Sequence, residues 1–502
     1  MGIVQKASIK LTIVSYLGAG LGYLNRVLLF THFLSAAEVG LAGVLVNAAV
    51  LYAQFASLGV PTISNRFFPF FNNKEKKHHG FFFWGNLFVF AGFLMTTLVF
   101  ILFKPLIIRQ YISSSPMIVD YYYYLIPFAL SFIYFQFFET YLRSLLKTVV
   151  PSFLNDVFSK ILVTLCITAY ALKLIDFHQF VIAYIGSNFL VTFILLVYII
   201  YLKQFFLLPG KSKVYKRLLK PILLYGAFTI LSTLGGSILV QIDSLMIAAK
   251  LDLGKAGIYS TIFLIASGLT YPYRSIQKTT YPLVGRFWKN RDMKAVSLLY
   301  EKTTLVMMIV GGGFMLLLWG NIDSIFRFIP KEYSIARYSF YILCFAKYFD
   351  MITGLNGIIT VTSKKYRYDL YFLLMLVVLT IILNLVFIPI YGITGAALAA
   401  MISLSFSNCL RVAFVWYNFN MQPFTRKCLW VLLITIGTLC IVHFIPFVIN
   451  KYISICINSA VIGIIYLGSI ILLRFSPEIN NMAYKITRWK FLQMDADNSM
   501  FK

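Results

Sequence analysis

Long runs of apolar residues alternate with short polar loops along most of the chain. Each run is about as long as the 20-residue helix that crosses the roughly 30 Å hydrocarbon core of a bilayer. Because lipid offers the backbone no hydrogen-bond partners, runs this long and continuous predict transmembrane helices rather than barrel strands. We therefore expect an all-α polytopic membrane protein. It should have about fourteen helices, at residues 11–33, 41–62, 81–103, 119–142, 150–173, 179–202, 222–248, 256–277, 299–320, 336–361, 369–389, 394–418, 428–448 and 452–474.

The composition and the placement of charge support a membrane protein. Hydrophobic residues make up 60% of the chain and charged residues 12%, far from the values typical of soluble domains. The formal net charge is +27, which in a soluble protein would suggest nucleic-acid binding. Here the Lys and Arg residues gather mostly in every second loop, as the positive-inside rule describes, so we expect no nucleic-acid partner.

The same charge pattern predicts the orientation of the chain. The basic loops lie at about 74–77, 143–147, 203–220, 286–294, 364–367 and 426–427, and the basic C-terminal tail follows residue 474. The intervening loops hold fewer positive residues and are short. Both termini are therefore predicted to face the cytoplasm, which agrees with an even number of helices.

The chain also repeats itself, at a constant offset of about 217 residues. Residues 18–74 lie over residues 235–291 without a gap, and Gly40 falls on Gly257. At the end of this stretch the loop sequence Asn-Lys-Glu falls on Asn-Arg-Asp. Since loops are less uniform in composition than apolar helices, this match supports a true repeat.

The repeat predicts how the chain is organised. We expect an N-terminal six-helix bundle at 1–210, a second six-helix bundle at 211–420, and two extra helices with a basic cytoplasmic tail at 421–502. An even number of helices per repeat makes the two repeats parallel. Transporters built from parallel repeats hold the substrate between the halves and move by rocking one against the other.

Two ionisable residues lie at equivalent depths of the two repeats. Arg26 lies about two-thirds along the first predicted helix, and its equivalent in the seventh is Asp243. Charges at membrane depth are costly and usually face a partner or a cavity. The two side chains could form a static ion pair, or a pair that opens when an anionic substrate competes for Arg26.

Four further charged residues are candidates for a substrate site. Lys347 and Asp350 are three residues apart in the tenth predicted helix, close enough to neutralise each other or to face a cavity. Arg274 and Arg411 lie toward the cytoplasmic ends of their helices. They could extend to the membrane surface, or line an inward-facing opening and bind a pyrophosphate.

The sequence contains no pattern typical of catalysis. We find no nucleotide-binding glycine motif, no metal-ligand spacing and no nucleophile–base arrangement, and so expect no cofactor, no metal and no enzymatic activity. The predicted outward loops are too short to form a catalytic domain.

Two stretches carry a family resemblance. They are Gln241–Ile247 followed by Ala256–Ser260, and Asn384 followed by Phe387–Gly392 and Gly395–Ala399. Both resemble polysaccharide flippases of the multidrug/oligosaccharidyl-lipid/polysaccharide exporter superfamily. The resemblance covers about residues 5–475 and implies two six-helix bundles that work by alternating access in the bacterial cytoplasmic (inner) membrane. It further implies an undecaprenyl-pyrophosphate-linked oligosaccharide as cargo, for O-antigen or capsule assembly.

The predicted function is therefore a flippase for a lipid-linked oligosaccharide, with membrane lipids around it and H⁺ or Na⁺ as a possible coupling ion. A drug or small-molecule exporter of the same superfamily is the first alternative, although such a protein would be expected to have a more acidic cavity. A membrane glycosyltransferase or polymerase is the second, and the short outward loops disfavour it.

Overall fold

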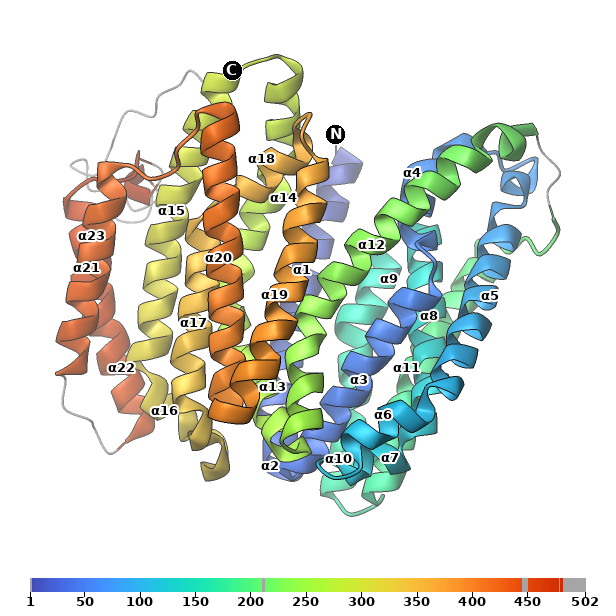
Figure 1. Cartoon of the computed structure of the whole chain (residues 1–502), viewed down its shortest axis with the longest axis horizontal. Helices are drawn as coiled ribbons and strands as arrows, with labels where there is room; N and C mark the ends of the chain where they lie inside the picture. Colours follow the sequence, from blue (N-terminus) through green and yellow to red (C-terminus); the bar gives the residue numbers. More distant parts are fainter. Residues whose placement is uncertain (1, 210–212, 445–449, 478, 482–502) are drawn as a thin grey trace. The chain divides into compact units, whose positions relative to one another are not determined.

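The computed structural model describes residues 2–209, 213–444, 450–477 and 479–481 (Figure 1). Within these ranges the secondary structure is entirely helical, with turns between the helices and no β-strand. Among the described residues, twelve helices are long and apolar enough to cross a membrane, or thirteen if one bent pair is counted as a span. The predicted all-α polytopic membrane fold is confirmed.

The predicted number of fourteen spans is not confirmed. The segment predicted at 428–448 begins as α21 (Arg426–His443), which is not among the twelve candidates. The rest of that segment, residues 445–448, lies outside the described residues, as does most of the predicted basic tail, at 482–502.

The chain divides into two compact units, residues 1–261 and 262–502. The boundary lies within α13 (Leu253–Ser267). Helix α12 (Lys213–Lys250) packs along α3 (Ala36–Ala56), so it belongs to the N-terminal unit. The compact units show which helices pack together, and they do not test which helices belong to which repeat. The predicted bundles at 1–210 and 211–420 and the C-terminal part at 421–502 therefore stay a prediction.

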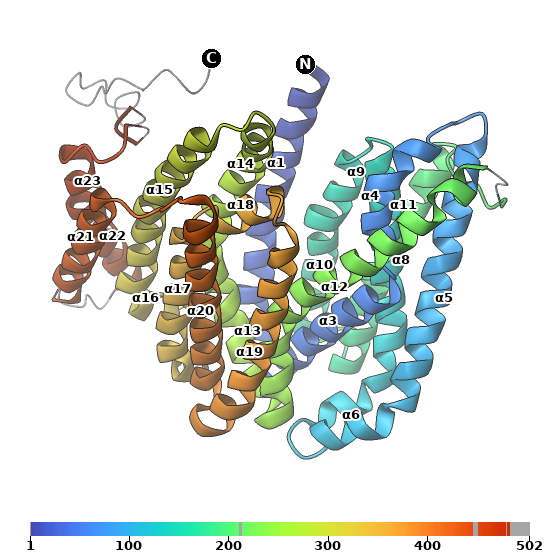
Figure 2. The same cartoon turned by 45° about the horizontal axis from the view of Figure 1, so that its top comes forward.

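The N-terminal unit contains the helices up to α12 and the first part of α13 (Figures 1 and 2). Besides α3, α12 and α13, its elements are α1 (Gly2–Tyr23), η1 (Leu24–Leu29), α2 (Phe30–Phe33), α4 (Val60–Phe71), η2 (Lys77–Gly80), α5 (Phe81–Leu102), α6 (Lys104–Tyr111), α7 (Pro116–Asp120), η3 (Tyr122–Tyr124), α8 (Leu125–Ser144), α9 (Val149–Phe153), η4 (Leu154–Phe158), α10 (Ser159–Ala171) and α11 (Phe177–Tyr201).

Helix α3 lies at the centre of this unit. It packs against α5, α8 and α12, and twelve of its residues are buried. Ser35 is the N-cap of the helix. Its hydroxyl and the carboxylate of Glu38 each accept a hydrogen bond from the other residue's backbone N–H. This capping box satisfies two of the N–H groups that a helix start leaves without partners.

The C-terminal unit is built around α15 (Met293–Gly320). Helix α17 (Arg337–Ile352) packs on it, and so do α21 and α22 (Lys451–Ile462) from beyond the predicted repeat. The other elements are η5 (Gly268–Thr270), α14 (Tyr271–Lys289), α16 (Ile322–Phe326), η6 (Lys331–Ala336), α18 (Asn356–Thr362), α19 (Arg367–Tyr391), α20 (Ile393–Phe419), η7 (Gly463–Leu467) and α23 (Gly468–Leu472).

Small residues allow this close packing. A methyl group on Gly311 would lie 2.8 Å from the Met351 side chain of α17, and one on Gly312 would lie 2.5 Å from the Tyr466 hydroxyl. That hydroxyl donates a hydrogen bond to the backbone carbonyl of Ile309 at 2.9 Å. The contact ties η7 to the core of the unit.

The span that contains α17 is broken. Helices α17 and α18 are bent by 47° at residues 353–355. Gly354 lies in the break with a φ of +73°, a conformation that glycine adopts without strain. Asp350 and Asn356 lie on either side of the break.

Candidate functional site

A polar cavity of about 320 Å³ lies within the C-terminal unit, beside the break between α17 and α18. Helices α14, α17, α18, α19 and α20 contribute to its wall. Four of its lining residues were predicted as site residues from the sequence: Arg274, Lys347, Asp350 and Arg411. These residues lie up to 137 positions apart in the chain, and the fold brings them to one cavity.

The carboxylate of Asp350 is held by a neighbouring helix. The Asn408 side-chain amide donates a hydrogen bond to Asp350 Oδ1 at 2.8 Å. Asn408 is buried, and it lies on α20 while Asp350 lies on α17. This contact orients the carboxylate and joins α17 to α20.

Arg411 forms an ion pair at the edge of the cavity. Its Nη1 lies 2.5 Å from Asp369 Oδ1, and the exposed fractions of the two side chains are 14% and 26%. The guanidinium carbon also lies 5.5 Å from the centre of the Phe372 ring. Arg411 therefore does not simply extend to the membrane surface: it bridges α20 and α19 and also lines the cavity.

The other two cations lie over aromatic rings. The Lys347 ammonium is 4.5 Å from the centre of the Phe263 ring, and the Arg274 guanidinium is 5.7 Å from that of Tyr271. Cation–π contacts stabilise a positive charge without neutralising it. With Asp350 and Asp369, the three cations give a net charge of +1 around the cavity. Such a site favours an anion.

Two polar side chains of the cavity have no hydrogen-bond partner within the described residues. They are the Nδ2 amide of Asn356 and the hydroxyl of Ser407, which are 4% and 2% exposed. A buried polar atom without a partner costs about 1–3 kcal/mol. Both atoms belong to residues that line the cavity, where a ligand or water could satisfy them.

Arg26 and Asp243 lie in the N-terminal unit and take no part in this cavity. Asp243 is buried and accepts a hydrogen bond from the Tyr259 hydroxyl at 2.9 Å. The Arg26 guanidinium carbon lies 5.7 Å from the centre of the Phe30 ring, and its Nη2 lies against Gly43 of α3. The substrate role of both residues stays a prediction.

Residues 4–288 match the polysaccharide biosynthesis protein family, which is more than half of the chain. The chain belongs to this family. This confirms the resemblance to polysaccharide flippases that was found in the sequence.

Two curated relatives are archaeal. An uncharacterized membrane protein of Methanocaldococcus jannaschii is 23% identical over 93% of this chain and 94% of its own length. The probable low-salt glycan biosynthesis flippase Agl15 of Haloferax volcanii is 23% identical over 41% of this chain and 45% of its own length.

Solved structures share the fold of this polysaccharide biosynthesis protein. The lipid II flippase MurJ in an inward closed conformation matches with a TM-score of 0.70 and 15% identity, over 95% of this chain and 99% of that one. An inward-facing multidrug resistance MATE family transporter matches with a TM-score of 0.59 and 14% identity, over 82% of this chain and 98% of that one. The relatives that carry an assigned role are flippases and transporters rather than enzymes, in agreement with the prediction.

Sequence reasoning missed Asn356, Ser407 and Asn408. Each is an uncharged polar residue in an apolar run, a signal too common in this sequence to separate them from other polar residues. Asp369 was also missed, because it lies near a predicted loop and has its partner 42 residues away.

Proposed function

We propose that this polysaccharide biosynthesis protein is a flippase that moves a lipid-linked oligosaccharide across the membrane. The observation that carries the proposal is the cavity where Arg274, Lys347 and Arg411 meet buried, unpartnered donors of Asn356 and Ser407. Guanidinium and ammonium groups suit phosphate oxygens, with which Arg forms two parallel hydrogen bonds. Family membership and the flippase role named for the relative Agl15 support the same function.

The size of the cavity suits only part of such a substrate. A volume of about 320 Å³ is at the lower end of the roughly 300–1,000 Å³ of small-molecule sites. We propose that it holds the pyrophosphate and the adjoining sugar, while the prenyl chain stays in lipid. Arg274, Lys347, Asp350 and Arg411 are the proposed substrate contacts in this cavity. Arg26 and Asp243 of the N-terminal unit are proposed as substrate contacts outside it.

The finer assignments belong to this proposal as well. They are an undecaprenyl carrier, a role in O-antigen or capsule assembly, alternating access driven by H⁺ or Na⁺, and location in a bacterial inner membrane with both termini in the cytoplasm. The predicted internal repeat supports alternating access, and the positive-inside pattern supports cytoplasmic termini. The carrier, the role in assembly and the bacterial membrane rest on the family resemblance of the sequence.

Depletion of the protein from its native host tests the function. A lipid-linked oligosaccharide should accumulate in the cytoplasmic leaflet, and mass spectrometry of its sugar and prenyl parts should identify the cargo. Purified protein in vesicles should then move that lipid between leaflets. If no lipid-linked saccharide accumulates and the vesicles do not move one, the proposal is wrong; export of organic cations by the same vesicles would favour a drug exporter.

A further inference from the structure

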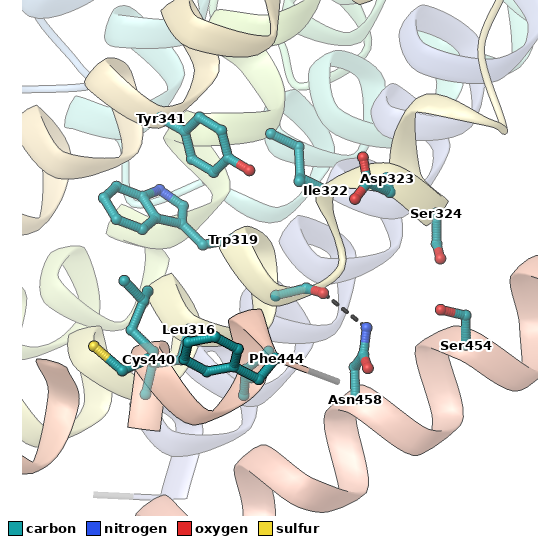
Figure 3. A pocket seen from close by; sticks show the side chains of 13 residues that line it. Leu316, Trp319, Ile322, Asp323, Ser324, Tyr341, Cys440, Phe444, Ser454 and Asn458 are labelled. Atoms are coloured by element: carbon teal, nitrogen blue, oxygen red, sulfur yellow. Dashed lines mark hydrogen bonds between the residues drawn. The ribbon is translucent and has the colours of Figure 1, made fainter. Parts of the chain in front are cut away.

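A second cavity of the C-terminal unit, of about 590 Å³, lies where the two helices beyond the predicted repeat pack on its core (Figure 3). The end of α15, the short α16 and α17 form one side. Residues of α21 and α22, with Phe444 after α21, form the other. The proposed flippase function does not use this cavity. The cavity gives α21 and α22 a defined role, because these two helices complete its wall.

One wall of this cavity is aromatic. The rings of Trp319 and Tyr341 meet edge to face, with their centres 5.1 Å apart, and Phe444 lines the cavity as well. Aromatic faces bind flat, weakly polar surfaces such as the C–H face of a sugar ring. Trp and Tyr suit such a role because each also carries a polar group.

The remaining wall combines aliphatic side chains with polar groups that are held in place; the aliphatic ones are Leu316, Ile322, Leu439 and Val442. The carboxylate of Asp323 forms an ion pair with Arg337, and both side chains are about half exposed. The Asn458 amide donates to the Gly320 carbonyl at 2.8 Å (Figure 3). Figure 3 shows the Tyr341 hydroxyl and the Asp323 carboxylate turned toward the same space.

One hydroxyl in this wall points to a ligand. Ser324 is 1% exposed, and its Oγ has no hydrogen-bond partner within the residues that the structure describes. Buried hydroxyls are usually hydrogen-bonded, and one that is not needs an explanation. A ligand with hydroxyl groups in the adjoining cavity would supply the missing partner.

We infer that this cavity is a saccharide-binding site. A sugar offers hydroxyls that both donate and accept hydrogen bonds, which suits the carboxylate, the amide and the serine hydroxyl, and an apolar face that suits Trp319 and Tyr341. A hydrocarbon chain in the same place would cover the Ser324 hydroxyl without giving it a partner, which is unfavourable. The volume suits a small oligosaccharide.

The saccharide site is separate from the cation-lined cavity. Tyr341 and Asp350 are nine residues apart on α17, which places them about 13 Å apart along the axis and on opposite faces of the helix. In the predicted orientation, the saccharide site lies near the outward loops and the cation-lined cavity lies nearer the cytoplasmic ones. This inference relies on the proposed function only for the source of its ligand, the glycan that the protein delivers.

Calorimetry on the purified full-length protein tests the site. The probe is the soluble oligosaccharide that mild acid releases from the lipid-linked glycans of the native host. Saturable binding is expected. In a parallel titration, the sugar should change the tryptophan fluorescence of the wild type, and the Trp319→Phe variant should lose this change. Ser324→Ala should weaken binding about tenfold, because it removes one hydrogen bond to the sugar. The melting temperature should stay the same or rise, because a hydroxyl without a protein partner contributes nothing to the fold.

Ser403→Ala is the matched control. Ser403 is also fully buried, its hydroxyl has no partner among the described residues, and it does not line this cavity. Its variant should bind like the wild type. Three results would overturn the inference: no saturable binding by the wild type, equal binding by both serine variants, or displacement of the sugar by farnesyl phosphate.

The site and the proposed function can fail separately. Vesicle transport with no sugar binding would leave the flippase function standing, whereas sugar binding with no transport would refute the function and keep the site.

Discussion

The main chains of Gly40 in α3 and Gly257 in α13 meet where the two helices cross. A Cβ atom on Gly257 would lie 2.7 Å from the backbone nitrogen of Gly40, and a Cβ atom on Gly40 would overlap the backbone of α13. The internal repeat predicted from the sequence pairs the same two positions.

Alanine at either glycine should therefore destabilise the protein. Since backbone atoms cannot yield as a flexible side chain does, we expect Gly40→Ala and Gly257→Ala each to cost about 1–3 kcal/mol and to lower the melting temperature in detergent. Gly22→Ala is the control, because its added methyl group would lie more than 4 Å from every described atom outside its own turn of helix. If Gly40→Ala and Gly257→Ala had the same melting temperature as Gly22→Ala, the close crossing of the two helices would be contradicted.

A substitution at Gly43 should test Arg26 without removing a charge. A methyl group on Gly43 would lie 2.5 Å from Arg26 Nη2 and 3.5 Å from the Ser260 hydroxyl. The guanidinium is the end of a flexible side chain, so it should move while the fold stays intact. We expect Gly43→Ala to lower polymer export toward the level of Arg26→Ala, with normal membrane insertion.

Complementation in cells that lack the protein measures this export, again with Gly22→Ala as the control. Normal polymer yield from Arg26→Ala would exclude a substrate role for this residue. Exchanging the charges, with Arg26→Asp and Asp243→Arg in one chain, should restore export only if the two residues act as a pair.

Loss of the amide at position 408 should disturb Asp350. In Asn408→Leu the carboxylate loses its cross-helix donor, which should cost about 1–3 kcal/mol and reduce transport in vesicles. Asn188→Leu is the matched control, since the Asn188 amide donates within its own helix, to the Tyr184 carbonyl at 3.0 Å. Equal melting temperatures and equal transport rates for the two variants would show that the contact with Asp350 is unimportant.

The Arg411–Asp369 pair should matter for both stability and transport. Because it is mostly shielded from solvent, Arg411→Gln should cost about 1–3 kcal/mol and also reduce transport. Arg143→Gln should cost less than about 1 kcal/mol, since Arg143 pairs with Glu139 on the surface, where half of its side chain is exposed.

The reversed pair separates the two roles of Arg411. With Arg411→Asp and Asp369→Arg in one chain, the melting temperature should recover while transport should not, because the cavity would then have lost a cation. Recovery of transport along with stability would mean that Arg411 acts only as a structural partner of Asp369.

Much of the candidate site was predictable from the sequence. Charged residues stand out in apolar helices because burying a charge is costly, and Arg274, Lys347, Asp350 and Arg411 all line one cavity. Their partners were not predictable, because Asn408 and Asp369 reach them across helix contacts that depend on packing. Lys347 and Asp350 are close in sequence, but this did not indicate their contacts. Asn408 donates a hydrogen bond to the Asp350 carboxylate, and the Lys347 ammonium lies over the Phe263 ring.

The sequence by itself determined the class of fold, because the length of an apolar run and the sign of the charge in the next loop act locally and depend on the bilayer alone. It also predicts a repeat, in which Gly40 falls on Gly257. Only the tertiary structure decided that these glycines touch, that α12 packs with the N-terminal unit and that the extra helices enclose a second cavity. Lipid-facing and protein-facing sides of a membrane helix are equally apolar, so the sequence carries little information on which helix packs against which.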